Sequence, residues 1–199
     1  ASIACVDLLV SMGLQKKNVR MIDRTGVIYA GRKEGMNPWK QGYAIETTDR
    51  TIEDAIDGAD LFMGLSGPGV LNGDLLKKMG EKPIILAMSN PIPEIMPEDA
   101  IAARPDAILA TGRSDYPNQV NNVLGFPYIF RGALDVRATT INGEMKIACA
   151  ESLAKLARED VPDEVAAAYS GTRPRYGPEY IIPAPFDPRL IRDIPPAVA

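Results

Sequence analysis

The sequence predicts an α/β protein with a doubly wound, Rossmann-like parallel sheet. Three short apolar segments, 60–65, 83–88 and 107–110, alternate with segments whose apolar residues have helical spacing. The apolar segments are continuous rather than alternating, which is typical of strands covered on both faces of a parallel sheet. Strands that alternate with helices along the chain form sheets of this class.

The remaining elements follow from local signals. In the first part of the chain, apolar spacing and the stop at Gly13 predict the opening helix, and Thr51 is a suitable N-cap. The elements expected there are a helix over 1–12, a strand over 18–23, a turn and extension over 26–29, a helical turn within 33–43 and a helix over 51–56. In the second part, helices are expected over 72–79, 97–103, 119–133, 143–158 and 163–169, and a proline-rich extended tail from Thr172.

We interpret residues 1–142 as a Rossmann-like dinucleotide-binding domain that lacks its first strand and glycine loop. Residues 143–199 are expected to add C-terminal helices and a tail packed on the same domain. No glycine fingerprint of the form GxGxxG precedes the first helix, so the chain is expected to begin just inside that motif. The neighbouring strands would then have unpaired edges that an upstream segment completes.

Composition excludes several classes of function. The 199 residues carry a formal charge of −4 without a basic block, so no nucleic-acid partner is expected. No apolar run reaches the roughly 18 residues of a membrane span. Cys5 and Cys149 are read as reduced thiols, which indicates the cytoplasm. The chain contains no histidine, so acid–base chemistry would need other side chains.

Polar or glycine-rich residues follow each predicted strand, where open parallel sheets bind their ligands. These segments begin at Asp23, Ser66, Ser89 and Thr111, and the last leads into the amide-rich segment 114–127. Asp23 lies 22 residues after Ala1, near the position about 20 residues beyond a glycine fingerprint where an acid binds ribose hydroxyls. Simple turn chemistry explains Asp23 equally well. Arg24, Arg32 and Lys33 are either candidates to bind a 2′-phosphate or solvated cations.

Several blocks resemble the cofactor-binding domain and C-terminal portion of bacterial malic enzymes. They are IDRTGVIYAGR, MGLSGPGVL, MSNPIPEI, the long block from Ala110 to Asn142, PDEVAAAY and GPEYIIPAPFDPRLI. The resemblance covers essentially the whole chain. It implies oxidative decarboxylation of L-malate to pyruvate and CO₂ with reduction of NAD or NADP, together with Mg²⁺ or Mn²⁺.

The resemblance also implies site residues. Asn90, Asn121 and Asn122 match positions that bind malate, and their neutral amides would tolerate both an anionic substrate and a nicotinamide ring whose charge changes. The cofactor-binding candidates are Asp23, Arg24, Ser66, Gly67, Asn90 and Asn122. Asn118 and Gln119 are expected to cap the following helix, whereas Glu94 and Asp115 are expected to be solvated loop carboxylates.

The family's catalytic lysine, its tyrosine and its three carboxylate metal ligands belong to the part before the glycine loop. We therefore assign no catalytic residue and no metal ligand in this chain, and we expect it to be inactive without an upstream catalytic domain. Homo-oligomers are expected from the resemblance. Asp23 favours NAD, because an acid repels a 2′-phosphate, whereas the resemblance favours NADP. Two alternatives stay open: the cofactor domain of another hydroxy-acid dehydrogenase, and a nucleotide-sensing or assembly module.

Overall fold

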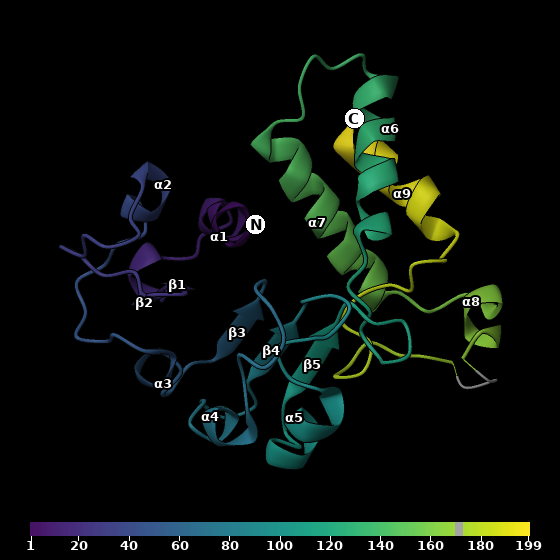
Figure 1. Ribbon diagram of the computed structural model, residues 1–199. Helices are drawn as coiled ribbons and strands as arrows, with labels where there is room; N and C mark the ends of the chain where they lie inside the picture. Colours follow the sequence, from purple (N-terminus) through teal and green to yellow (C-terminus); the bar gives the residue numbers. More distant parts are fainter. Residues whose placement is uncertain (170–172) are drawn as a thin grey trace.

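A three-stranded parallel sheet forms the centre of the protein. The computed structural model describes residues 1–169 and 173–199 (Figure 1). The strands β3 (Leu61–Gly64), β4 (Ile84–Ala87) and β5 (Ile108–Thr111) lie in this order, with Leu61, Ile84 and Ile108 side by side at their first residues. The predicted α/β class with a parallel sheet is confirmed.

One face of this sheet carries the main apolar core. The helices α3 (Ile52–Ala55), α4 (Gly73–Lys77) and α5 (Pro97–Ala103) supply it together with Ile85 and Ala87. On the other face Leu61 and Ile84 remain 41% and 36% exposed. The second face is therefore less completely covered in the described chain than the continuous apolar strands predict.

The helices around this core begin where local capping chemistry places them. Thr51 and Asp54 form a reciprocal capping box at the start of α3. The Asn72 side chain accepts a hydrogen bond from the Leu75 N–H at 2.9 Å and so starts α4, as expected from the sequence. Helix α5 occupies the predicted residues, with Pro97 at its first position.

The N-terminal segment, residues 1–50, differs from the prediction in one respect. It contains α1 (Ser2–Ser11), the 3₁₀ helix η1 (Lys16–Asn18) and α2 (Pro38–Gln41). The predicted strand 18–23 is confirmed only at its end: Ile22–Asp23 form β1, which pairs antiparallel with β2 (Gly26–Val27) rather than joining the parallel sheet. The reason lies in packing, because Met21 contacts Ile28 and Tyr43 in a small separate cluster. In Figure 1 the hairpin lies between α2 and α3, and it forms a two-stranded sheet separate from that of β3.

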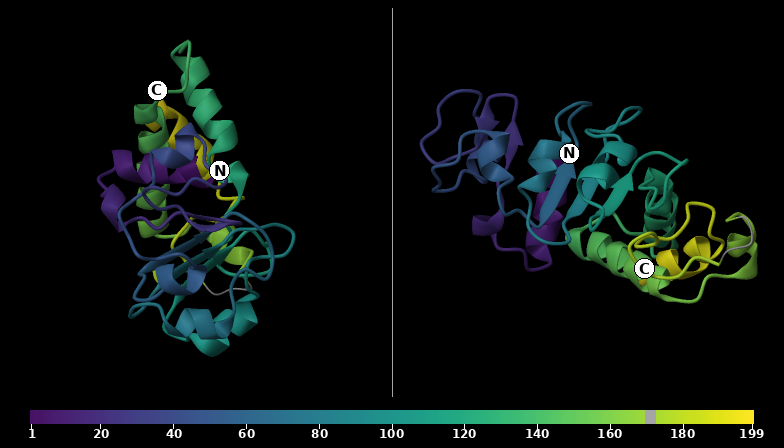
Figure 2. Two further views of the ribbon diagram at one scale, coloured as in Figure 1. Left: turned by 60° about the vertical axis from the view of Figure 1, so that its left-hand side comes forward. Right: turned by 90° about the horizontal axis from the view of Figure 1, so that it is seen from below.

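The C-terminal part is helical. Its elements are η2 (Asn122–Leu124), α6 (Phe126–Asp135), α7 (Gly143–Arg158), α8 (Asp163–Ala167) and α9 (Arg189–Val198). Helices α6 and α7 both pack against α9, on the opposite side of the sheet from the N-terminal hairpin (Figure 2). None of the helices in the described ranges combines the length and the apolar content that crossing a membrane requires.

Helix α9 corrects the expectation of a wholly extended tail. Leu190, Ile194 and Val198 repeat every fourth residue and are buried against α6 and α7. Pro195 and Pro196 conceal this pattern in the sequence, because proline inside a helix is unfavourable. Thr172, the start of the predicted tail, lies outside the described residues. The division at residue 142 stays a prediction.

Candidate functional site

The loops after β4 and β5 meet at the carboxyl edge of the sheet. A Cβ added at Gly112 would lie 3.7 Å from the Met88 carbonyl oxygen and 4.0 Å from the Asn90 Cβ. It would also lie 3.9 Å from the carbonyl oxygen of Val120. The Val120 N–H donates to the Thr111 carbonyl at 2.8 Å, which returns the chain to β5. Asn90 and the segment leading to Asn121 therefore share one edge, as the strand-end rule predicts.

A glycine loop follows β3 at the same edge. No atom lies within 4 Å of the place that a Cβ would take at Gly67 or Gly69, and Gly69 has a φ of +74°. The backbone of both residues is thus open to close approach by a ligand, which is how glycine-rich turns admit a dinucleotide. A hollow of about 560 Å³ opens beside Gly69, between this loop, segment 92–96 and helices α4 and α5. The open backbone at Gly67 and Gly69 therefore fits the close approach of a dinucleotide.

Glu94 lies beneath this loop, and its expected exposure is wrong. The side chain is fully buried. One carboxylate oxygen accepts a hydrogen bond from the Ser66 N–H at 3.0 Å, and the other accepts one from the Ser89 N–H at 3.1 Å. A buried carboxylate is tolerated when backbone donors satisfy it. The sequence signal that could have indicated this is the apolar residue on either side, Pro93 and Ile95.

The amides of the predicted substrate site differ in their local roles. The Asn121 side chain accepts a hydrogen bond from the Val123 N–H at 3.0 Å and begins η2. Its carbonyl oxygen is therefore engaged by the backbone, while its amide nitrogen stays available as a donor. Asn90 and Asn122 are exposed, so their side chains can reach a ligand at this edge. Asp115 is exposed, as expected, and pairs with Arg113 at 2.6 Å.

Asn118 has a structural role other than the expected helix cap. It is buried with a φ of +56°, a conformation that asparagine tolerates better than most residues. Its amide nitrogen donates to the carbonyls of Leu109 and Pro178, at 2.9 and 2.7 Å, and its oxygen accepts from the Ile181 N–H at 2.8 Å. Asn118 therefore joins β5 to the C-terminal tail. Gln119 forms a bridge with Thr111 beside β5.

Asp23 and Arg24 lie on the β1–β2 hairpin rather than in the loops that follow β3, β4 and β5. The Asp23 carboxylate contacts Arg32 with both oxygens at 2.7 Å and Lys40 at 2.6 Å. Burial alone would raise the pKa of Asp23, but hydrogen bonds from Lys40, Arg32 and the Thr25 N–H outweigh it and lower the pKa. Arg32 is buried and also donates to the Gly26 and Val27 carbonyls. Arg24 and Lys33 are exposed.

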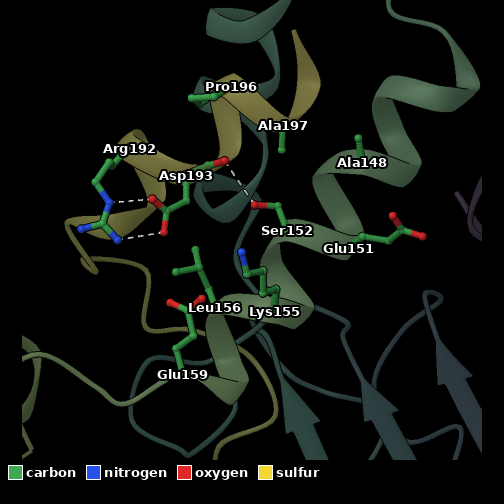
Figure 3. A pocket seen from close by; sticks show the side chains of 10 residues that line it. All are labelled: Ala148, Glu151, Ser152, Lys155, Leu156, Glu159, Arg192, Asp193, Pro196 and Ala197. Atoms are coloured by element: carbon green, nitrogen blue, oxygen red, sulfur yellow. Dashed lines mark hydrogen bonds and ion pairs between the residues drawn. The ribbon is translucent and has the colours of Figure 1, made fainter.

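A hollow of about 500 Å³ between α7 and α9 is not a candidate for this site. The Ser152 hydroxyl donates to the Asp193 carbonyl at 3.3 Å, and Arg192 pairs with Asp193 at 2.6 Å (Figure 3). The charges of Arg192 and Asp193, which both line this hollow, thus neutralise each other. None of the predicted site residues lines this hollow.

The described ranges hold no group of three or more His, Cys, Asp or Glu side chains close enough together to bind a metal ion. The residues present therefore do not fit a Mg²⁺ or Mn²⁺ site made by this chain alone. The carboxyl edge of the sheet can instead bind a ligand through the amide side chains and the open glycine backbone.

Comparison with known proteins gives consistent matches. The family model of the malic enzyme NAD-binding domain matches residues 3–169. The chain is 65% identical over its whole length to an NADP-dependent malic enzyme of Rhizobium meliloti, and 57% identical to an NAD-dependent malic enzyme of the same organism. It spans about a quarter of each of these relatives, 26%. A crystal structure of an NAD-dependent malic enzyme from Thermotoga maritima superposes with a TM-score of 0.82 at 36% identity, covering 100% of this chain and 48% of that one.

Proposed function

Because the chain belongs to the malic enzyme family, through that family's NAD-binding domain, we propose that it is the dinucleotide-binding part of an enzyme that converts L-malate to pyruvate and CO₂. One observation carries this proposal. Two loops at the carboxyl edge of one parallel sheet carry the open backbone of Gly67 and Gly69 and the exposed side chain of Asn90. Asn121 and Asn122 follow β5 at the same edge.

The residues of this chain bind and orient rather than transfer protons. The dinucleotide, when bound, accepts the hydride that leaves malate. Gly67 and Gly69 would admit it close to the backbone, and Ser66 would lie at the start of that loop. The amide nitrogens of Asn90, Asn121 and Asn122 would donate to malate carboxylates and to the nicotinamide carboxamide. Neutral amides suit this role, because they bind an anion without opposing the charge change of the ring.

We assign the acid–base groups and the metal ligands to an upstream catalytic domain of the same polypeptide. The sequence has no histidine, and the edge described above carries no lysine–tyrosine pair or carboxylate cluster to which such roles could be given. Within the described sheet β3 pairs on one side only, with β4, so its other edge can receive a further strand. The upstream domain would complete both the sheet and the site, and this chain by itself would be inactive.

NADP is the dinucleotide that we propose. An acid at the Asp23 position would normally repel a 2′-phosphate, but here Arg32 and Lys40 offset the charge of Asp23. The neighbouring Arg24 is exposed and free to meet a phosphate. In the full-length enzyme, Arg24→Ala should raise KM for NADP and leave KM for NAD nearly unchanged. Equal effects on the two would contradict this assignment.

We also propose that the full-length enzyme is a homo-oligomer. The exposed apolar side chains Phe126, Phe130 and Leu134 lie four residues apart on α6, so they form one stripe that another surface could cover. Light scattering on the full-length enzyme would give the mass directly. A monomeric mass over the working concentration range would contradict the proposal.

The decisive experiment measures malate-dependent formation of reduced dinucleotide and of pyruvate by the full-length enzyme. Asn90→Ala and Asn122→Ala should each lower kcat/KM for malate by about tenfold to hundredfold, the cost of one hydrogen bond to a charged group. Asn18→Ala, an exposed asparagine in η1, is the matched control. Turnover of another hydroxy acid but not malate would indicate a different dehydrogenase. Dinucleotide binding without any turnover would indicate a sensing or assembly module.

A further inference from the structure

Glu94 is a buried charged side chain to which the proposed function gives no task. Its carboxylate lies at the carboxyl edge of the sheet, directly below the loops that are proposed to bind the dinucleotide and malate. Its partners are backbone N–H groups, one from each of two strand ends, rather than a basic side chain. Such an arrangement is costly to bury, so the contacts themselves indicate what the residue does.

Glu94 holds two loops closed at both of their ends. The first loop runs from Ser66 to Leu71: the Ser66 N–H donates to the carboxylate at 3.0 Å, and the Leu71 N–H donates to the Glu94 carbonyl at 3.1 Å. The second loop runs from Ser89 to Glu94 itself, and the Ser89 N–H donates to the other carboxylate oxygen at 3.1 Å. Gly67 and Gly69 lie inside the first loop, and Asn90 lies inside the second.

The carboxylate continues the sheet where its ladder ends. The last rung between β3 and β4 is the hydrogen bond from the Met88 N–H to the Gly64 carbonyl, at 3.2 Å. Just beyond this bond, the backbone N–H groups of Ser66, two residues after Gly64, and of Ser89, one residue after Met88, donate to the Glu94 carboxylate instead of to the neighbouring strand. Without an acceptor at that place, these two partly buried N–H groups would lose their partner.

Gly64 makes room for this contact. A Cβ at residue 64 would lie 2.4 Å from the Glu94 Cδ and 2.7 Å from each carboxylate oxygen. Any side chain there must displace the carboxylate, because contacts this short do not occur between real atoms. Gly64 and Glu94 therefore form one unit, although thirty residues separate them in the sequence.

We propose that Glu94 is a positioning residue, which sets the separation and orientation of the glycine loop and the Asn90 loop and so couples dinucleotide binding to malate binding. The inference rests on the proposed function, because it assigns those loops to the two ligands. Glutamine cannot replace Glu94, because its amide offers one oxygen acceptor and turns an N–H₂ donor toward a backbone N–H. Displacing a binding group by about 1 Å costs roughly a hundredfold in rate.

The test compares Glu94→Gln, Gly64→Ala and the double variant Gly64→Ala/Glu94→Gln in the full-length enzyme. Glu81→Gln is the matched control, an exposed glutamate ahead of β4, at the opposite end of that strand. The measurements are the Kd for reduced dinucleotide by fluorescence titration, kcat and KM for malate, and the Tm. Titrations are made well below the lowest Tm, so that a loss of binding reports on folded protein.

We expect Glu94→Gln and Gly64→Ala each to raise the dinucleotide Kd and the malate KM by about tenfold or more. The double variant should be little worse than either single one, because both substitutions break the same contact. Glu81→Gln should match the wild type. A lower Tm with unchanged Kd and KM would make the role of Glu94 merely structural and overturn the proposal, and so would additive effects in the double variant.

Two kinds of failure can be told apart. If the wild-type enzyme binds dinucleotide but does not oxidise malate, the proposed function fails, while the Kd series still tests Glu94. If Glu94→Gln does not fold, the Gly64→Ala variant alone decides, since it keeps the carboxylate and only displaces it. An unchanged Kd in folded Gly64→Ala would overturn the inference.

Discussion

The N-terminal segment (1–50) and the sheet unit, residues 51–112, are held together by different forces. The core of the sheet unit contains nine buried apolar residues, which come from α4, β4, α5 and the segments that flank these elements. The corresponding cluster of the N-terminal segment contains three, Met21, Ile28 and Tyr43. Helix α1 has no buried residue although its composition is strongly apolar. The two regions are of similar length, so chain length does not explain the difference.

Polar contacts take the place of a core in the N-terminal segment. Asp23 joins Arg32 and Lys40, and Arg20 pairs with Asp49 at 2.8 Å. Tyr43 donates a hydrogen bond to Asp7 of α1. Charge pairs of this kind depend on geometry and ionisation, whereas apolar burial depends mainly on the area removed from water. The two regions should therefore respond to different perturbations.

The largest effect is expected in the sheet unit. Leu76 is fully buried among α4, α5 and β4, so Leu76→Ala should lower the free energy of unfolding by about 2–5 kcal/mol. Leu61→Ala is the matched control, because Leu61 on β3 is 41% exposed, and it should cost well under half as much. Urea denaturation followed by circular dichroism gives both values. Equal costs would refute the view that the sheet unit depends on its core.

The next effect is expected at the centre of the polar network. Asp23→Asn removes the charge that faces the buried Arg32, at a cost of about 1.5–3 kcal/mol. The loss should be local, so hydrogen exchange should speed up in 20–45 before it does in the sheet strands. Asp57→Asn, at an exposed aspartate of the sheet unit, is the control and should change neither region. Uniform loss of protection over the chain would show that the two regions unfold together.

A smaller difference in stability between the N-terminal segment and the sheet unit is expected when the pH is lowered. The pKa of Asp23 is lowered despite its burial, by hydrogen bonds from Lys40 and Arg32, and that of Asp49 is lowered mainly by Arg20. A carboxyl with a lowered folded-state pKa stabilises the fold above its unfolded-state pKa of about 3.9, and this contribution is lost as the pH falls through the folded-state value.

Protection of the N-terminal segment should accordingly decline below about pH 4, before protection of β3, β4 and β5 does. Hydrogen exchange corrected for the intrinsic rate at each pH measures this. The salt bridge of Arg104 with Asp106 in the sheet unit, where the Asp106 pKa is also lowered by Arg104, serves as the internal comparison. Simultaneous loss in both regions would mean that the apolar core adds no acid resistance.

The smallest effect is expected in α1. Leu9→Ala should cost less than about 1 kcal/mol in the 199-residue chain, because no side chain of α1 is buried. In the full-length enzyme the same substitution should cost clearly more if the upstream domain covers this helix. Thermal unfolding of both proteins with and without the substitution measures the difference. An equally small cost in both would indicate that α1 remains uncovered.

The sequence by itself determined the elements whose signals are local. Helices α5 and α7 have the predicted bounds, because Pro97 and Asn142 mark their starts and apolar spacing carries them onward. The α/β class followed from continuous apolar strands alternating with helices. The placement of Asn90 beside the loop after β5 followed from a general rule, that parallel strands bring their carboxyl ends to one edge.

Only the tertiary structure decided what depends on residues far apart in the chain. Glu94 is buried because its acceptors meet amides at residues 66 and 89, and Asn118 is buried because Pro178 and Ile181 reach it. Segment 18–23 is not part of the parallel sheet, because Met21 packs on Ile28 and Tyr43 instead. Helix α9 forms despite two prolines because its apolar stripe is buried against α6 and α7. Burial and pairing of this kind arise from contacts across the fold, which local propensity does not encode.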